Sequence, residues 1–363
     1  MTKVLAIETS CDETAVAVLE HTEGGIAVLA NIVSSQASLH AAYGGVVPQL
    51  AAREHIKNIT PVLTEAIEKA NVTKAEIDFI AVTEGPGLMP ALLVGVNAAK
   101  TLALIWDKPL MGIQHLEGHI YANLLRENTT LEFPLIALIV SGGHTELVLM
   151  ENHFQYEILG ETQDDASGEA FDKVAKLLGL PYPGGPEVAT RADIFRTSHT
   201  NEDISELSNK FPRPMLNTDN YNFSFSGLKT AVLYAIQKES EENKARPDFI
   251  PSMCHAFQEA VVDVLVGKTR KALTLYNPRT FVIAGGVSAN VRLRERLTQL
   301  IEKEFTETNF LTPDFKYSLD NAAMIGAAAL IRYAQMNEPQ RDSLRVNATV
   351  MEPNPNLPLQ PFD

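Results

Sequence analysis

The chain has 363 residues, of which 45% are hydrophobic, so it can bury a substantial core and is expected to form two domains or one large lobed domain. Its formal net charge of −15 argues against binding of nucleic acid by bulk attraction, so an RNA partner would need a local basic patch or a helper protein. The chain has two cysteines, no signal-peptide pattern and no uninterrupted apolar run near the roughly 18 residues of a membrane helix, which indicates a cytoplasmic protein without a disulfide framework.

The predicted elements of the first half alternate between strands and helices. A short apolar strand, a polar turn at residues 8–13 and a second strand form an opening hairpin. Later segments have either the helical spacing of apolar residues or the short apolar runs of buried strands. In chain order we expect strands at 4–7 and 14–19, a helix at 52–70, a strand at 79–82, a helix at 92–106 and a strand at 110–113. Such alternation is typical of an α/β fold.

The second half repeats this pattern at a constant offset. It opens with strands at 135–138 and 145–149 around a small polar turn. Three pairs of identical residues are each 131 residues apart, namely Ser10 and Ser141, Thr14 and Thr145, and Glu20 and Glu151. The expected later elements are a helix at 256–275, a strand at 280–284 and a helix at 291–304, with a long surface loop or insertion at 201–222 and a solvated charged stretch at 239–248. The repeat predicts a duplicated domain.

His115 and His119 are the first candidate metal ligands. They stand four residues apart, which on a helix places both imidazoles on one face, although such pairs also occur by chance and need at least one further ligand. Glu117 lies about 200° around a helix from His115, so it cannot act as the general base of a zincin-type peptidase. Asp320 precedes an apolar helical stretch, where a helix N-cap is favoured over a role as an oxygen ligand, although both roles could coexist.

Turns rich in glycine and other small residues suggest a second site. They stand at residues 141–144, 166–173, 182–186 and 284–290, and the third is expected to be a bare turn. Glycine lets backbone N–H groups approach a phosphate, and a following helix adds its dipole. None of the turns matches a P-loop or a dinucleotide-binding fingerprint. Because they recur at strand ends in both halves, they favour nucleotide or phosphate binding at the carboxyl ends of the strands.

Charged residues near these turns are less informative. The acidic ones are expected to be helix caps or solvated groups rather than acid–base catalysts, and they are Asp12, Glu13, Asp164, Asp165, Glu169 and Asp172. A basic cluster could contact RNA but is more often a solvated helix face, and it comprises Lys268, Arg270, Lys271, Arg292, Arg294 and Arg296.

The ordered motifs resemble those of the TsaD family, the bacterial tRNA N(6)-adenosine threonylcarbamoyltransferases. They run in the family's order over about residues 4–330, and the tail beyond about residue 335 lies outside them. The matching segments are residues 8–14, 43–48, 85–88, 115–119, 141–145, 168–173, 182–186, 285–290 and 320–324. Ser318 stands where many relatives carry cysteine, and Leu116 and Gln49 also depart from common choices, but none of these removes a ligand.

The resemblance implies an α/β fold of the actin-like ATPase class, the class of sugar kinases, Hsp70 and actin, with two similar lobes from an internal duplication. We expect an N-terminal lobe at residues 1–114, completed by a helix at about 320–335. We expect a C-terminal lobe at residues 115–319, with the metal and nucleotide motifs, and an extended or disordered tail at 336–363.

The resemblance also implies a cofactor and a bound substrate. One divalent metal ion per subunit is expected, iron (Fe²⁺) first and zinc as the alternative, with His115, His119 and Asp320 as ligands. This replaces the cap assignment of Asp320. The implied substrate, threonylcarbamoyl-AMP, contains an adenine nucleotide and is expected to lie against Ile139, Val140, Ser141, Gly142, Gly143, Asp172, Gly185 and Asn290.

The implied reaction transfers the threonylcarbamoyl group to the exocyclic amine of the adenosine 3′ of the anticodon, in tRNAs that read codons beginning with adenine. That amine is a poor nucleophile, so catalysis should act on the electrophile, through a metal and through the N–H groups of residues 141–143. Asp12 and Glu13 are candidate general bases. Family members work with TsaB and TsaE, which fits the acidic surface. The alternatives are an actin-like ATPase or sugar kinase, a metallopeptidase, and a non-catalytic scaffold, which should lack the metal triad.

Overall fold

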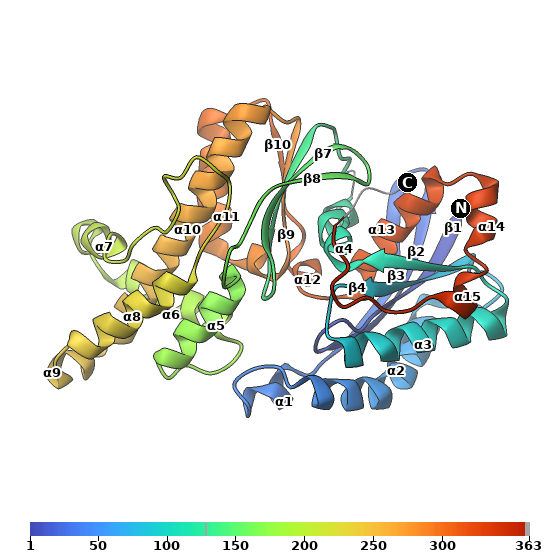
Figure 1. The fold of residues 1–363 in the computed structure, drawn as a ribbon, viewed down its shortest axis with the longest axis horizontal. Helices are drawn as coiled ribbons and strands as arrows, with labels where there is room; N and C mark the ends of the chain where they lie inside the picture. Colours follow the sequence, from blue (N-terminus) through green and yellow to red (C-terminus); the bar gives the residue numbers. More distant parts are fainter. Residues whose placement is uncertain (128, 360–363) are drawn as a thin grey trace. The chain divides into compact units, whose positions relative to one another are not determined.

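The computed structural model describes residues 1–127 and 129–359, in two compact units (Figure 1). Unit 1 combines Met1–Leu131 with Pro313–Asp363, and unit 2 is Glu132–Thr312. The expected boundaries after residues 114 and 319 therefore differ from those of the structure. The physical reason is that helix α4 (His115–Tyr121) and the 3₁₀ turn η1 (Ala122–Leu125) pack against helix α13 of unit 1. Both predicted metal-binding histidines accordingly belong to unit 1.

Unit 1 is built on a five-stranded sheet in the order β3-β2-β1-β4-β5. The first three strands are antiparallel neighbours, whereas β4 and β5 run parallel to β1. The strands are β1 (Thr2–Glu8), β2 (Glu13–Thr22), β3 (Gly25–Ser35), β4 (Phe79–Gly85) and β5 (Leu110–Gln114). The side chains of Val4, Leu5, Ala6 and Ile7 are fully buried, because helices cover both faces of β1. This explains its continuous apolar sequence.

Helices cover the sheet of unit 1 on both sides. Helices α2 (Pro48–Ala70) and α3 (Met89–Trp106) lie side by side on the face that Leu5 and Ile7 occupy (Figure 1). Helix α13 (Ala322–Gln335) covers the opposite face, where a Cβ on Gly326 would lie 3.3 Å from the Ala6 Cβ. The remaining helices of this unit are α1 (Ala37–Ala41), α12 (Phe315–Ser318), α14 (Glu338–Ser343) and α15 (Asn347–Val350).

Unit 2 repeats the sheet topology of unit 1. Its order is β10-β9-β6-β7-β8, with β6, β7 and β8 antiparallel and β9 and β10 parallel to β6. The strands are β6 (Leu135–Val140), β7 (Thr145–Asn152), β8 (Gln155–Glu161), β9 (Thr280–Ala284) and β10 (Asn309–Leu311). The register repeats as well, because Leu5 pairs with Val18 and Ile136 pairs with Leu149. The predicted duplication is confirmed.

The long helix α10 (Phe249–Tyr276) is the central helix of unit 2. The helices that contact it are α5 (Ser167–Leu177), α6 (Gly184–Ser198), α7 (Asn201–Ser208), α8 (Ser226–Lys238), α9 (Glu241–Lys244) and α11 (Val291–Glu304). The 3₁₀ turn η2 (Gly286–Ala289) precedes α11. By length and composition alone, α3 and α10 are apolar enough to cross a membrane. However, 83% of the relevant window of α10 is buried inside the protein, and α3 packs on α2 and β4. Helix α10 is therefore a core helix of unit 2, whereas α3, with 33% of its window buried, covers the sheet of unit 1 with one face and leaves the other exposed.

Three expectations about irregular segments are wrong. The segment 201–222, expected as a loop, begins with α7, and the expected bare turn at 182–186 contains the start of α6 at Gly184. The tail is neither extended nor disordered between residues 338 and 350, because it forms α14 and α15. Packing explains this difference, since Ala348 and Met351 join the core of unit 1. Residues 360–363 of the predicted tail lie outside the described residues.

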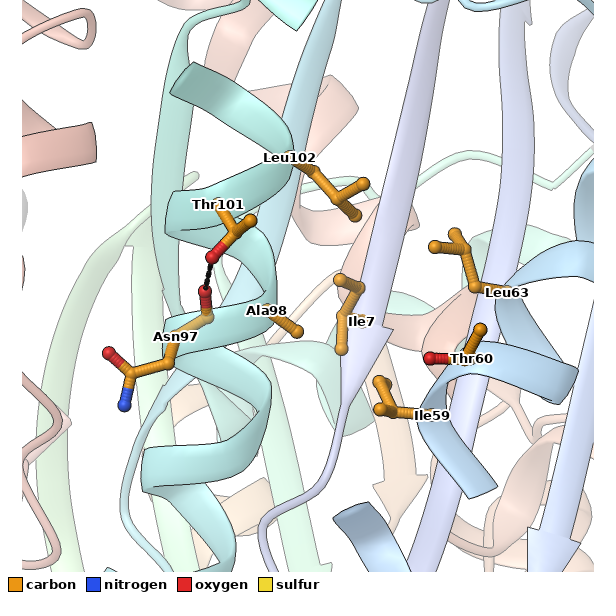
Figure 2. A pocket seen from close by; sticks show the side chains of 8 residues that line it. All are labelled: Ile7, Ile59, Thr60, Leu63, Asn97, Ala98, Thr101 and Leu102. Atoms are coloured by element: carbon orange, nitrogen blue, oxygen red, sulfur yellow. Dashed lines mark hydrogen bonds between the residues drawn. The ribbon is translucent and has the colours of Figure 1, made fainter. Parts of the chain in front are cut away.

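A cavity of about 320 Å³ opens between α2 and α3 in unit 1 (Figure 2). Figure 2 shows Ile7 of β1 between the two helices, with Leu63 on the α2 side and Leu102 on the α3 side. The eight residues that line this cavity include none of the predicted metal or substrate residues. This cavity therefore lies apart from the candidate chemistry.

Candidate functional site

The metal-ligand candidates of unit 1 are carried by α4, which follows β5 directly. The side chain of Gln114 caps this helix, because its Oε1 accepts hydrogen bonds from the N–H groups of Leu116 (2.6 Å) and Glu117 (3.0 Å). Gly118 allows close packing on α13, since a Cβ there would lie 2.8 Å from the Cδ1 of Ile325. His115 and His119 lie one turn apart with their rings 4.7 Å from each other, as the spacing predicted.

Asp320 completes a three-residue group with these histidines. Its Oδ1 lies 3.5 Å from His115 Nε2 and 3.2 Å from His119 Nε2, and the three ligand atoms all lie within 4.8 Å of one another. The N-cap of α13 is Asn321, whose side chain accepts a hydrogen bond from Met324 N–H, so assigning the cap to Asp320 from spacing alone was wrong. The structure therefore brings together all three metal ligands that the resemblance implied.

Sequence reasoning missed a second carboxylate next to His115. Glu8, fully buried at the end of β1, places Oε2 3.1 Å from His115 Nδ1, and Ser10 Oγ lies 3.2 Å from the same nitrogen. Burial opposes protonation of His115, but the charges of Asp320 and Glu8 outweigh it and raise the pKa of the imidazole to about 9. The sequence did contain one indication of this role, because Glu8 is a charged residue directly after the apolar run of β1.

The chemistry of this group fits a divalent cation. Two imidazoles and one carboxylate are a ligand set that suits iron or zinc. His119 is 1% exposed, and its Nδ1 has no hydrogen-bond partner within the described chain. The surroundings are strongly acidic, since burial and the charges of Asp320 and Asp12 raise the pKa of Glu13 well above its usual value. A bound cation would relieve this repulsion.

Glu117 is directed away from the histidines. Its carboxylate oxygens both lie 2.5 Å from Nη2 of Arg332, so it forms a buried ion pair with α13. The predicted position about 200° around the helix agrees with this arrangement. Glu117 therefore joins the helix of the two histidines to the helix that Asp320 precedes, and its engagement with Arg332 does not suit a peptidase base.

Unit 2 contains the glycine-rich candidate site. The turn after β6 is closed by hydrogen bonds between Ser141 N and His144 O (2.8 Å) and between His144 N and Ser141 Oγ (3.0 Å). Gly168 at the start of α5 donates its N–H to Ser141 O (3.1 Å), and a Cβ on it would lie 2.6 Å from that oxygen. Gly285 has a φ of +84°, and a Cβ there would lie 2.5 Å from Val140 O. Three of the four predicted small-residue turns therefore meet at the end of β6.

The remaining substrate candidates surround this junction. Asp172 Oδ1 accepts a hydrogen bond from Gly184 N (2.7 Å), which joins α5 to the start of α6, where Gly185 lies. Asn290 caps α11 through Leu293 N–H (3.0 Å). Ile139 and Val140 of β6 have no exposed surface, so they lie beneath the turn that follows the strand. A Cβ on the glycines at 142, 143 and 185 would meet no atom within 4 Å, so these three border open space.

The basic cluster is part of the packing of unit 2. Glu259 binds both Arg292 (2.6 and 3.0 Å) and Arg296 (3.1 Å), and Arg296 also binds Asp263 (2.9 Å). Lys268 is fully buried and donates to backbone and hydroxyl oxygens of the preceding loop. These contacts argue against a solvated helix face or an RNA surface at Lys268, Arg292 and Arg296, whereas the side chain of Arg270 is 54% exposed, as a solvated helix face predicts.

Comparisons with known proteins show the family of the chain. A family model described as tRNA N6-adenosine threonylcarbamoyltransferase, TsaD, matches residues 27–327. A protein of that name from Halalkalibacterium halodurans is 50% identical over 335 residues, which are 92% of this chain and 91% of the relative. Another from Bacillus anthracis is 47% identical over 361 residues, 99% of this chain and 97% of the relative. The solved structure of HypF from T. kodakarensis matches with a TM-score of 0.58 at 14% identity, over 92% of this chain and 48% of that one, which bears on the fold alone.

Proposed function

The chain belongs to the TsaD family of tRNA N6-adenosine threonylcarbamoyltransferases, and we propose that it performs this transfer with a divalent metal ion bound by His115, His119 and Asp320. The single observation that supports the metal is the convergence of these three side chains within 4.8 Å, next to further acidic groups. Iron is proposed first and zinc as the alternative, because the ligand set suits both. The bound metal would polarise the carbonyl group of the donor substrate.

The donor is proposed to be threonylcarbamoyl-AMP, with the junction at the end of β6 as its binding site. Backbone N–H groups of residues 141–143 and the start of α5 are suited to a phosphate. Asp172, Gly185 and Asn290 would form further contacts, and Ile139 and Val140 would support the turn from beneath. The support is the open space beside the glycines of this junction.

The proposed chemistry is an acyl transfer. The N6 amine of adenosine attacks the carbamoyl carbon, the bond from that carbon to the phosphate oxygen breaks, and AMP leaves with the electron pair. The amine must also lose a proton, for which Asp12 and Glu13 are the candidate acceptors in the turn after β1. The N–H groups of residues 141–143 would stabilise the charge on the departing phosphate.

We further propose that the RNA is bound with the help of partner proteins of the TsaB and TsaE type, in the cytoplasm. The net charge of −15 does not attract RNA, and Arg292 and Arg296 of unit 2 are engaged with Glu259. The target is the adenosine 3′ of the anticodon in tRNAs that read codons beginning with adenine. It must be presented unstacked for its amine to react.

The test combines purified protein, threonylcarbamoyl-AMP, such a tRNA and the partner proteins, with modified adenosine measured by mass spectrometry. We expect product from the wild type and its loss in the double variant His115→Ala with His119→Ala. His21→Ala, on β2, serves as the matched histidine control and should retain activity. Absence of product from the wild type, or full product from the double variant, would contradict the proposal.

A further inference from the structure

Glu8 is a buried charge that the sheet itself does not require. It ends β1 with no exposed surface, and burying a carboxylate is costly unless it is paired and hydrogen-bonded. The duplicated half gives an internal comparison, because Glu8 pairs with Ala15 and its repeat equivalent Ile139 pairs with Glu146. Ile139 is also fully buried. An apolar residue therefore satisfies this sheet position, and the carboxylate is present in the half that contains His115.

The contacts of Glu8 are directed to one histidine nitrogen. Its Oε1 accepts the N–H of Ser10, and its Oε2 accepts the hydroxyl of Thr83 at 2.6 Å and lies 3.1 Å from His115 Nδ1. Because a carboxylate only accepts hydrogen bonds, Nδ1 must carry the hydrogen. In the neutral imidazole, the lone pair is then on Nε2, the atom that lies 3.5 Å from Asp320 Oδ1.

The two histidines of the candidate site differ in the hydrogen-bond partners of their Nδ1 atoms. Among the described residues His119 Nδ1 has no hydrogen-bond partner, whereas His115 Nδ1 has the carboxylate of Glu8 and the hydroxyl of Ser10. A metal-ligating histidine is commonly oriented by a carboxylate on its second nitrogen, and loss of that carboxylate weakens metal binding. His115 is therefore the oriented ligand of the pair.

We propose that Glu8 is a positioning residue that fixes the tautomer and ring orientation of His115, so that Nε2 is presented to the metal. This inference rests on the proposed metal site and adds a residue to it. Glu8 does not contact substrate in this account. It acts through the histidine, while Thr83 and Ser10 hold its carboxylate in place.

The test measures metal affinity rather than activity. Zn²⁺ and Co²⁺ binding to the full-length protein would be determined by competition with a chelator at fixed pH, and the Co²⁺ absorption spectrum would report the ligand set. Glu8→Ile, which imports the residue of the other half, should fold but bind metal about 10–100-fold more weakly. Glu8→Gln keeps an acceptor of the same reach and should stay within about tenfold of the wild type. Glu146→Ala, which removes a buried carboxylate from unit 2, should leave affinity unchanged.

The outcomes separate this inference from the metal site itself. Melting of the metal-free protein shows whether Glu8→Ile is folded, and a loss of metal-induced stabilisation in a folded variant supports the inference. Equal affinity of the wild type and of Glu8→Ile would overturn the role of Glu8 and leave the metal site intact. A wild type that binds no metal would overturn both, and the transfer assay would still report on the reaction.

Discussion

Removal of the charge of Glu117 is expected to destabilise unit 1 strongly. Glu117→Gln keeps the size of the side chain but removes the charge that is bonded to Arg332, and both side chains of this pair are largely buried, at 2% and 11% exposed. Loss of one partner of a buried ion pair typically costs about 3–5 kcal/mol of unfolding free energy. The double variant Glu117→Leu with Arg332→Met removes both charges and should be considerably closer to the wild type.

The assay can report on unit 1 alone. Trp106, the single tryptophan of the chain, packs against the core of unit 1, so its fluorescence during urea unfolding follows this unit. The matched control is Glu54→Gln on α2, which breaks a more exposed pair with Lys57 and should cost less than about 1 kcal/mol. If Glu117→Gln unfolds like this control, the ion pair does not hold α4 on α13, and the structural role given to Glu117 is refuted.

Three further changes test other parts of the structure. Burial and the charge of Glu161 raise the pKa of Glu146 to about 7, so the wild type should lose stability as the pH rises from about 5 to 8. Over that pH range the unfolding free energy of Glu146→Gln should rise by up to about 3 kcal/mol relative to that of the wild type, measured by urea unfolding followed by circular dichroism. A difference in unfolding free energy that does not change with pH would contradict this. Gly168→Ala places a methyl group against the backbone of the turn after β6 and should lower transfer activity. Gly227→Ala should not lower it, because a Cβ at that position meets no atom within 4 Å. Asn321→Ala removes the cap of α13 and should cost about 1 kcal/mol by the same fluorescence assay; no change would refute the cap.

The hairpins and the duplication were predictable because they depend on local patterns. Ser10 and Ser141 occupy equivalent turns in the two halves. The spacing of apolar residues indicates which segments are strands and which are helices. The tail was not predictable in this way. Leu344, Ala348 and Met351 have the i, i+4, i+7 spacing of one helix face, but this single short repeat lies among proline and asparagine residues. The segment is ordered by packing on a unit whose other residues are distant in sequence.

In the candidate site, too, local features were predictable from the sequence and contacts between distant residues were not. The four-residue spacing placed His115 and His119 on one face of a helix, but only the family resemblance assigned Asp320 as their partner. Spacing alone favoured a cap at Asp320, because the choice between adjacent Asp320 and Asn321 depends on backbone geometry. Glu8 was missed because its partner is more than 100 residues away in sequence, and the sheet brings them together.

The central claim is that the transfer requires a metal held by the triad. The most direct test strips the protein of metal with a chelator, restores Fe²⁺ or Zn²⁺ in steps, and measures modified adenosine in tRNA by mass spectrometry alongside the metal content. We predict that product from the wild type follows the bound metal up to one ion per chain, and that His119→Ala neither binds the ion nor forms product. Full product from the metal-free wild type would contradict the account.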